Sequence, residues 1–372
     1  MKPSILIVSP LYPPARGGVA DHTHRLAQEL SAQAGVSVLT SLGTTGDEPV
    51  RVCPLIRDWS NAPELLGILS ETAAQSAILW QYVPHMYGRG GVNLALPKVM
   101  AALHKQGRRQ IVIVHEIAAP FSPWPHRLWY ALAHRWQWRR ILQEADAIGI
   151  STEAWLEEWT RRTPQFRKKF RLLPSPSSIP IASVASDHRQ TWRRRHGLPT
   201  AARMLLYFGS LNPSKQFSWV LTAWQQAQAA EVPVALVIVG DHSKESVPRG
   251  LSNLFKDLGY LAAEEVSAAL QAADVLALPF IDGVSERRTS FMAGLNHGCA
   301  IVTTVGHNTG PTLRQADFFA IPKKPERGAF AARVAALLAD EPQRIQLGRR
   351  AQSAYELGYS WPVLISRLAE CA

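Results

Sequence analysis

Short apolar runs alternate with helical stretches along the whole chain of 372 residues, and this alternation limits the possible folds more than any other feature. In the first half, the runs that predict strands cover residues 5–10, 36–40, 77–82, 111–116, 147–151 and 170–173. Unbroken apolar runs of this length are typical of parallel strands that are covered by helices on both faces. The stretch 19–34 predicts such a helix, with one face formed by Val19, Thr23, Leu26, Ala27 and Leu30.

The alternation breaks at residues 174–180, where the sequence PSPSSIP can form neither a helix nor a central strand. A charged helix is expected at 188–196, and strands then return at 204–208, 235–239, 275–280, 300–304 and 319–321. The chain is also long for a single core. We therefore predict an α/β protein of two Rossmann-like, doubly wound domains, residues 1–180 and 181–357, facing each other across a cleft.

Charge and composition restrict the partners and the compartment. The formal net charge of +11 indicates an anionic partner, such as a nucleotide, a phospholipid surface or a nucleic acid, without choosing among them. The first apolar run is too short for a signal peptide or a membrane span, and no later run is long enough to cross a bilayer. Three scattered cysteines, Cys53, Cys299 and Cys371, fit a reduced cytoplasmic protein without disulfides or a metal cluster.

Two adjacent arginines, Arg287 and Arg288, stand where the strand at 275–280 gives way to a short helix from Thr289. A helix N-terminus favours an anion, and the forked donors of arginine suit phosphate. Ligands of α/β sheets bind at the carboxyl ends of the strands. We interpret this turn, with its neighbours Ser285, Glu286 and Ser290, as a phosphate-recognition turn; a solvated arginine pair with a capping serine or threonine is the alternative.

Two further loops stand between a strand and a helix. The loop 9–21 contains Gly17, Gly18 and Asp21, and paired glycines leave backbone N–H groups free for an anion. The loop 208–216 occupies the same place in the second half and contains Gly209, Ser210 and Lys215, whose ammonium group suits a diphosphate. Ordinary turns between a strand and a helix are the alternative for both.

Two polar groups follow strands of the first half. His115, next to Glu116, is a candidate acid–base or sugar-binding residue, although a histidine bonded to Glu116 or to the backbone explains it nearly as well. Residues 151–153, Ser-Thr-Glu, have the pattern of a helix cap, which is the favoured interpretation. A place in the lining of the cleft is the alternative.

The segment from Trp124 to Arg140 interleaves tryptophans with arginines, and no acidic residue occurs from 117 to 143. Tryptophan prefers the lipid headgroup region, and arginine attracts anionic lipid. The segment therefore predicts an interfacial helix at the inner face of the membrane. A helix with a Trp/Leu core face and a solvated basic face remains open, and nucleic-acid binding is disfavoured because no known binding motif accompanies the basic and aromatic residues.

The order of these motifs resembles that of GT-B glycosyltransferases of the GT4 type. The resemblance rests on PLYPPARGGVAD, the lysine-bearing loop after Phe208, VIVGD, the turn 259–261, the run from 277 to 304 and Ser360-Trp361. It implies a closing helix, 358–372, that joins the first domain, which would hold the acceptor. It also implies a nucleotide-diphospho-sugar donor held mainly by the second domain, retention of configuration, and no metal or other cofactor.

The resemblance also implies roles for individual residues. Gly17 and Gly18, with Asp21 beside them, would approach the donor diphosphate or sugar, His115 would touch the donor sugar, and Lys215 would bind the diphosphate. The base would lie between Asp241 and the turn containing Tyr260 and Leu261.

Two positions depart from the family pattern. Leu211 stands where the family has an arginine two residues after the glycine equivalent to Gly209, and Ser285 and Ala293 replace its two spaced glutamates. Our hypothesis is that Arg287 and Arg288 replace the arginine, and that Glu286 replaces the ribose-binding carboxylate.

The predicted activity is transfer of a hexosyl unit to a saccharide acceptor linked to a lipid, as in envelope or exopolysaccharide assembly. Cations from both domains would stabilise the departing diphosphate. A nicotinamide oxidoreductase is disfavoured because the first strand is not followed by GxGxxG. A degenerate, non-catalytic binding protein is the alternative that Ala293 supports.

Overall fold

The chain forms two compact units in a computed structural model that describes residues 4–15, 17–44, 50–72, 76–118, 121, 124–212, 214–241 and 254–371. Unit 1 comprises Met1–Ser151, Trp155–Pro174 and Trp361–Ala372, and unit 2 comprises Thr152–Ala154 and Ser175–Ser360. The chain therefore passes into unit 2 inside the predicted linker, six residues before the expected boundary at 180, and returns to unit 1 just before its last helix.

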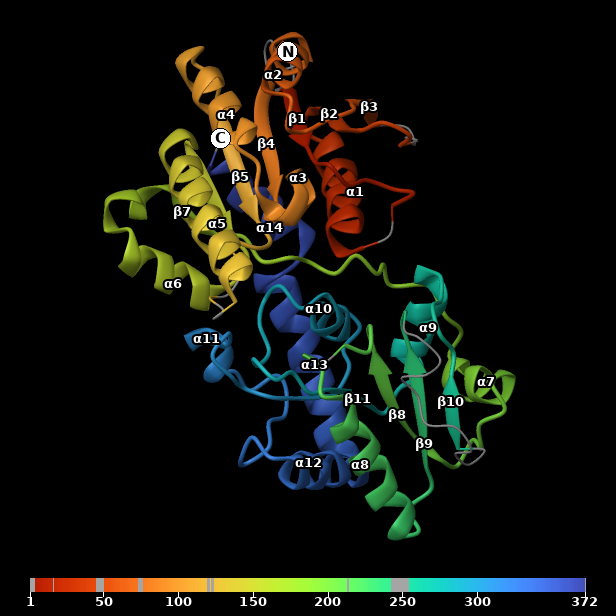
Figure 1. Cartoon of the computed structure of the whole chain (residues 1–372). Helices are drawn as coiled ribbons and strands as arrows, with labels where there is room; N and C mark the ends of the chain where they lie inside the picture. The colour runs from red at the N-terminus through yellow and green to blue at the C-terminus, as the bar shows by residue number, and fades with distance from the viewer. Residues whose placement is uncertain are drawn as a thin grey trace. The chain divides into compact units, whose positions relative to one another are not determined.

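Unit 1 is built on a seven-stranded parallel sheet with the order β3-β2-β1-β4-β5-β6-β7 (Figure 1). Its strands are β1 (Ser4–Val8), β2 (Gly35–Ser41), β3 (Arg51–Ile56), β4 (Ser76–Tyr82), β5 (Gln110–Val114), β6 (Ala147–Ile150) and β7 (Phe170–Leu172). Its helical segments are α1 (Gly18–Ser31), α2 (Ala62–Thr72), α3 (Pro84–Tyr87), η1 (Arg89–Gly91), α4 (Ala95–Lys105), α5 (Pro125–Glu144), α6 (Glu153–Arg162), η2 (Pro164–Lys169) and α14 (Trp361–Ala369).

Both faces of this sheet are covered, as unbroken apolar strands require. Buried side chains of α2, α4 and α5 form one core with the sheet, whereas those of α1 and α14 form the other. The chain therefore returns from unit 2 to complete the core of unit 1 with Trp361, Leu364, Ile365 and Leu368.

Unit 2 repeats this arrangement on a five-stranded parallel sheet with the order β10-β9-β8-β11-β12. Its strands are β8 (Arg203–Phe208), β9 (Val234–Val239), β10 (Phe255–Asp257), β11 (Val275–Leu278) and β12 (Ile301–Thr303). Its helices are α7 (His188–Arg195), α8 (Phe217–Ala229), α9 (Ala263–Ala272), α10 (Thr289–Asn296), α11 (Pro311–Arg314), α12 (Arg327–Ala339) and α13 (Glu341–Gly358). Helices α8 and α12 cover one face, and α7, α9, α10 and α13 cover the other (Figure 1).

The prediction of an α/β fold with two doubly wound parallel sheets is confirmed, with three errors in detail. The sequence analysis missed the edge strands β3 and β10. It also predicted a strand at 319–321, where only Ala320 forms an isolated bridge to Val302.

Each sheet reverses its direction of growth once. In unit 1, β1 lies between β2 and β4, and in unit 2, β8 lies between β9 and β11. At such a switch point the loops that follow the two neighbouring strands diverge to opposite faces and leave a crevice for ligands. The relevant loops are therefore those after β1 and β4 in unit 1, and those after β8 and β11 in unit 2.

Candidate functional site

The loops that follow β8 and β11 bring the predicted cations of unit 2 together. Lys215 lies in the first loop, and Arg287 and Arg288 lie in the second. Pro213 of the first loop, and Arg16 of the glycine-rich loop in unit 1, lie outside the described residues.

Lys215 folds back over Gly209. A side-chain carbon added to Gly209 would come within 2.5 Å of the ammonium nitrogen of Lys215, and the Gly209 φ of 132° is one that other residues rarely adopt. The ammonium group also donates to the hydroxyl of Ser210 at 3.4 Å. Because Gly209 has no side chain, the ammonium group of Lys215 can lie directly against its backbone.

Arg288 is held close to this lysine. Its guanidinium pairs with Asp282 and lies 4.6 Å from the ring centroid of Phe280, so it is fixed from two sides. Burial, with a smaller contribution from the positive charge of Arg288, lowers the pKa of Lys215 to about 8. Two cations in a poorly hydrated place with one nearby carboxylate favour an additional anion.

The start of α10 has no side-chain cap, so the alternative interpretation with a capping serine or threonine is wrong. Arg288 occupies the N-cap position without a side-chain bond to the helix. Thr289 is exposed on the first turn, whereas Ser290 is buried, with its Cβ 3.8 Å from the position that a side-chain carbon of Gly209 would take. Ser290 therefore adjoins the Gly209–Lys215 cluster, and Thr289 points toward solvent.

Ser285 and Glu286 are buried polar residues with unused hydrogen-bonding capacity. The hydroxyl oxygen of Ser285 and Oε2 of Glu286 have no hydrogen-bond partner among the described residues, although the two side chains are 0% and 1% exposed. Burial raises the pKa of Glu286 to about 7; backbone hydrogen bonds to the carboxylate oppose this rise, and the carboxylate of Glu153 adds a smaller contribution to it. Unsatisfied buried polar atoms are costly, and a ligand is one way to satisfy them.

The residues predicted to flank the base lie around the end of β9. The N–H group of Gly240 donates to the carbonyl of Gly259 at 2.8 Å, which ties the turn at 259–261 to the segment before Asp241. Asp241 and Tyr260 are exposed, and Leu261 is half-buried. They are connected to the Lys215 loop through Gly240, whose Cα faces the carbonyl of Gly209.

In unit 1, Gly17 and Gly18 form an open start to α1. Both are exposed, Gly17 has a φ of 142°, and no atom lies within 4 Å of the side-chain carbon that either could carry. Asp21 is exposed on the first turn, and its N–H group donates to the carbonyl of Gly17 at 3.0 Å. That these residues approach the same diphosphate as Lys215 stays a prediction.

His115 follows β5 and is held by a residue that the sequence analysis did not consider. Its Nε2 lies 2.6 Å from Oε1 of Gln81, and its contact with a donor sugar stays a prediction. The ring also contacts His22, with centroids 5.0 Å apart, and burial lowers the pKa of His22 to about 4. The helical spacing of three residues from Val19 was the signal that would have found His22.

The helix cap predicted at 151–153 stays a prediction, and Glu153 also contacts a second helix. The carboxylate of Glu153 accepts hydrogen bonds from the backbone N–H of Thr312 at 2.7 Å and from its hydroxyl at 2.9 Å. The carboxylate of Glu153 therefore accepts hydrogen bonds at the start of α11.

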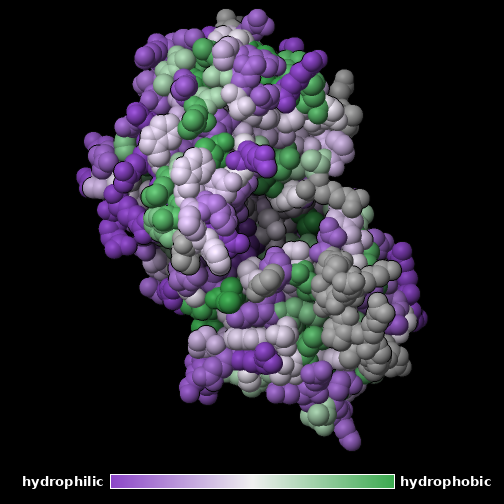
Figure 2. Space-filling view, in the orientation of Figure 1, coloured by the Kyte–Doolittle hydropathy of each residue, from purple (hydrophilic) through white to green (hydrophobic). Residues whose placement is uncertain are grey.

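The tryptophan-rich segment forms α5, and its two faces differ. Leu128, Trp129, Leu132 and Trp136 are 40–57% exposed on one face. Trp138 is fully buried and packs against Tyr82 at 5.9 Å, so its assignment to a membrane surface is wrong. In Figure 2, pale and green side chains lie among purple ones over the region where Figure 1 draws α5.

In the described part of the chain, no group of three His, Cys, Asp or Glu side chains is arranged to hold a metal ion. No described helix combines the length and the apolar character that crossing a bilayer requires.

Comparison with solved structures identifies the class. HepE from Anabaena, solved in complex with UDP and glucose, aligns over 99% of this chain and 98% of its own with a TM-score of 0.74 and 15% identity. WaaG, a glycosyltransferase involved in lipopolysaccharide biosynthesis, aligns over 99% of both chains with a TM-score of 0.72 and 13% identity. Sucrose-phosphate synthase from Thermosynechococcus elongatus gives 0.71 and 16%, over 99% of this chain and 98% of its own. The fold is thus that of GT-B glycosyltransferases.

The sequence itself matches one family. Residues 202–340, which contain the Lys215 and Arg288 loops, match the family Glycosyl transferases group 1. A search of curated protein sequences found no significant match. The matched residues lie within unit 2.

Proposed function

We propose that this protein transfers a hexosyl unit from a nucleotide-diphospho-sugar to a saccharide acceptor. The observation that carries the proposal is that the positive groups of Lys215 and Arg288 lie close together at the switch point of the unit 2 sheet. A diphosphate bound there would satisfy the two cations and meet the first turn of α10. The complexes of HepE with UDP and glucose support the choice of a nucleotide sugar.

The same cations account for the chemistry. When the bond between the anomeric carbon and the diphosphate breaks, its electron pair stays on the phosphate oxygen. An acceptor hydroxyl bonds to that carbon and passes its proton to the departing phosphate oxygen. Lys215, Arg287 and Arg288 are preorganised donors for the charge that develops on the leaving oxygen. In this proposal they take the place of a metal ion, and transfer retains the anomeric configuration.

We further propose that Glu286 replaces the ribose-binding carboxylate. Ala293 is fully buried in the core of unit 2 and presents no polar atom to a ligand. Glu286 lies in the loop just before α10, and its Oε2 has no hydrogen-bond partner among the described residues. A ribose hydroxyl would satisfy that oxygen.

A non-catalytic binding protein is the second candidate, because Ala293 removes a carboxylate that the family pattern contains. The two candidates differ in one observable: only an enzyme releases the nucleoside diphosphate. We therefore propose a screen of UDP-, GDP- and ADP-sugars by thermal shift, followed by measurement of diphosphate release from any sugar nucleotide that binds.

Variants of the two cations test the mechanism. Loss of one preorganised donor typically lowers turnover by about 100-fold, so Lys215→Ala and Arg288→Ala should each lose at least that much while remaining folded. Lys323→Ala and Arg327→Ala are matched controls, because both residues are exposed in unit 2 and neither belongs to the loops after β8 and β11. Near-normal release by the two site variants would remove Lys215 and Arg288 from the mechanism.

For the acceptor, we propose a lipid-linked saccharide at the cytoplasmic face of a membrane. The exposed apolar face of α5, defined above, is bordered by the exposed arginines Arg127, Arg139 and Arg140. Apolar side chains that enter the headgroup region together with arginines that attract anionic lipid make a surface for a bilayer. The involvement of WaaG in lipopolysaccharide biosynthesis is consistent with this proposal.

Sedimentation with vesicles tests the membrane proposal separately. Vesicles containing anionic lipid should bind the protein, whereas neutral vesicles should not. The double variant Trp129→Ala/Trp136→Ala should lower binding, and Leu357→Ala should leave it unchanged, because Leu357 is 80% exposed but lies in unit 2. Equal partition to neutral vesicles, or no partition at all, would reject this surface.

A further inference from the structure

A polar cavity of about 330 Å³ lies in unit 2 at the edge of the sheet where the strands begin. Arg203 is the first residue of β8, Asp274 directly precedes β11, and Ala300 directly precedes β12. The Lys215 and Arg288 loops follow the opposite ends of β8 and β11. A six-residue strand spans about 20 Å, so this cavity is separate from the candidate site. Its volume is within the range of small-molecule pockets.

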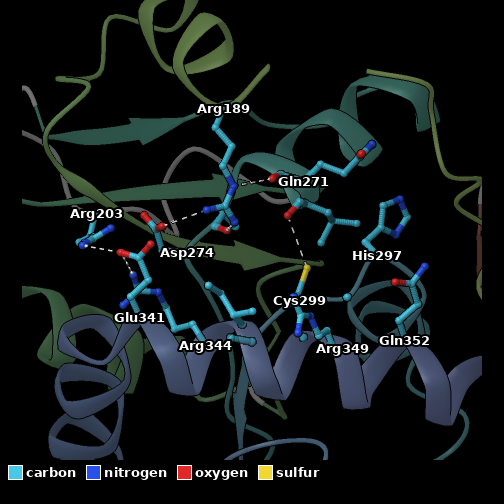
Figure 3. Close-up of a pocket in the computed structure, with 16 residues that line it drawn as sticks. Arg189, Arg203, Gln271, Asp274, His297, Cys299, Glu341, Arg344, Arg349 and Gln352 are labelled. Carbon is cyan, nitrogen blue, oxygen red and sulfur yellow. Dashed lines mark hydrogen bonds and ion pairs between the residues drawn. The ribbon is translucent and has the colours of Figure 1, made fainter. Parts of the chain in front are cut away.

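Arginines outnumber carboxylates in the lining of this cavity. The arginines of the lining are Arg189, Arg203, Arg344 and Arg349, and its carboxylates are Asp274 and Glu341 (Figure 3). Figure 3 shows Arg189 reaching in from the side opposite α13, which contributes Arg344, Arg349 and Gln352.

Both carboxylates are already shared between arginines. Asp274 is 4% exposed and lies 2.7 Å from Arg193 and 3.4 Å from Arg189. Glu341 lies 3.3 Å from Arg203 and 3.6 Å from Arg344. Neither carboxylate therefore has the capacity to neutralise a further cation.

Arg349 takes no part in the ion pairs of Asp274 and Glu341. Among the described residues neither Arg349 nor Gln352 makes a hydrogen bond or ion pair, although both line the cavity. Burial lowers the pKa of Arg344; Asp274 and Glu341 oppose this shift, and the positive charges of Arg203 and Arg189 add to it. The lining therefore carries an excess of positive charge that a dianion would offset.

We propose that this cavity binds the phosphate group of a small phosphorylated metabolite, with Arg349 and Arg203 donating to the phosphate and Gln352 contacting the remainder of the molecule. Guanidinium groups present paired donors that match phosphate oxygens, and amide side chains suit sugar hydroxyls. The proposal does not depend on sugar transfer, because its ligand lies at the other edge of the sheet.

Isothermal titration of the full chain with glucose 6-phosphate at low ionic strength tests this site. Wild type should bind glucose 6-phosphate and not glucose, and Arg349→Ala should weaken binding at least tenfold. Arg350→Ala is the matched control and should change binding less than twofold, because Arg350 pairs with Asp317 at 2.9 Å and does not line the cavity. Arg288→Ala should bind glucose 6-phosphate as wild type does. Gln352→Ala provides a second variant of the cavity that changes no charge and should also weaken binding.

Several results would overturn the proposal. These are no binding to wild type, equal binding of glucose, or equal losses in Arg349→Ala and Arg350→Ala. A loss in Arg288→Ala without a loss in Arg349→Ala would place the phosphate in the donor loops instead. Sedimentation with anionic vesicles separates a lipid headgroup from a soluble phosphate: Arg349→Ala should sediment as wild type does, and a matching loss of vesicle binding would reject a soluble ligand.

Discussion

Lys215 should make nucleoside diphosphate binding depend on pH in a range where an ordinary lysine would not. Its pKa of about 8 lies below the usual value of 10.5, because the ammonium group is buried beside Arg288. The protonated fraction is therefore about nine-tenths at pH 7, half at pH 8 and one-tenth at pH 9. If only the charged amine attracts the diphosphate, the association constant should fall about tenfold between pH 7 and pH 9.

Isothermal titration with UDP, GDP and ADP measures this change directly. The terminal phosphate of these probes has a pKa of about 6, so it remains ionised through most of the window. An amine with the usual pKa would remain almost fully charged to pH 9 and would give a nearly flat profile. Lys215→Met should bind weakly at every pH and lose the dependence. A flat wild-type profile, or the same slope in Lys215→Met, would refute the role of this lysine.

Three further predictions concern stability and binding together. The pKa of Lys215 is lower in the folded state than in the unfolded state, so its charged form opposes folding at pH 7, and this cost disappears above pH 10.5. Chemical denaturation at pH 7 should therefore show Lys215→Met to be more stable than wild type by up to about 3 kcal/mol. An unchanged or lower stability of the variant would contradict the burial of this lysine. The raised pKa of Glu286 should make the stability of the wild-type protein fall as pH rises from 4.5 to 7. Glu286→Gln should therefore be more stable than wild type by up to about 3 kcal/mol at pH 8 and equally stable at pH 4, and it should bind the donor more weakly. If the variant and the wild type were equally stable at both pH values, the raised pKa would be refuted. Gly209→Ala should lower both the melting temperature and the affinity for nucleoside diphosphates. The added methyl group would collide with the ammonium group of Lys215, and alanine rarely adopts the φ of 132° that Gly209 has. A variant with the melting temperature and the affinity of the wild type would refute that geometry.

Interior strands were predictable because their signal is local. The central residues of β1, β8, β9 and β11 form unbroken apolar runs, which is the pattern of a sheet buried on both faces. The edge strand β3 contains Arg51 and Pro54, and the edge strand β10 contains Lys256 and Asp257, so neither shows that pattern. Phe319 belongs to an apolar run but packs against Phe291 at 5.5 Å instead of extending a strand.

The places of the candidate loops were predictable, but their side-chain contacts were not. Topology alone puts Lys215 and Arg288 at the same end of the sheet. The return of Lys215 over Gly209 and the position of Arg288 over Phe280 depend on packing between loops far apart in sequence. The position of Trp138 was within reach of the sequence, because helical periodicity puts it on the face of Ala131, Ile141 and Leu142, all of them buried.

A crystal structure of the protein with a bound nucleoside diphosphate tests the central claim most directly. The diphosphate should lie within hydrogen-bonding distance of the ammonium group of Lys215 and the guanidinium group of Arg288, next to the first turn of α10. A diphosphate bound elsewhere, with Lys215 still bonded to Ser210 and Arg288 still paired with Asp282, would contradict the proposed function.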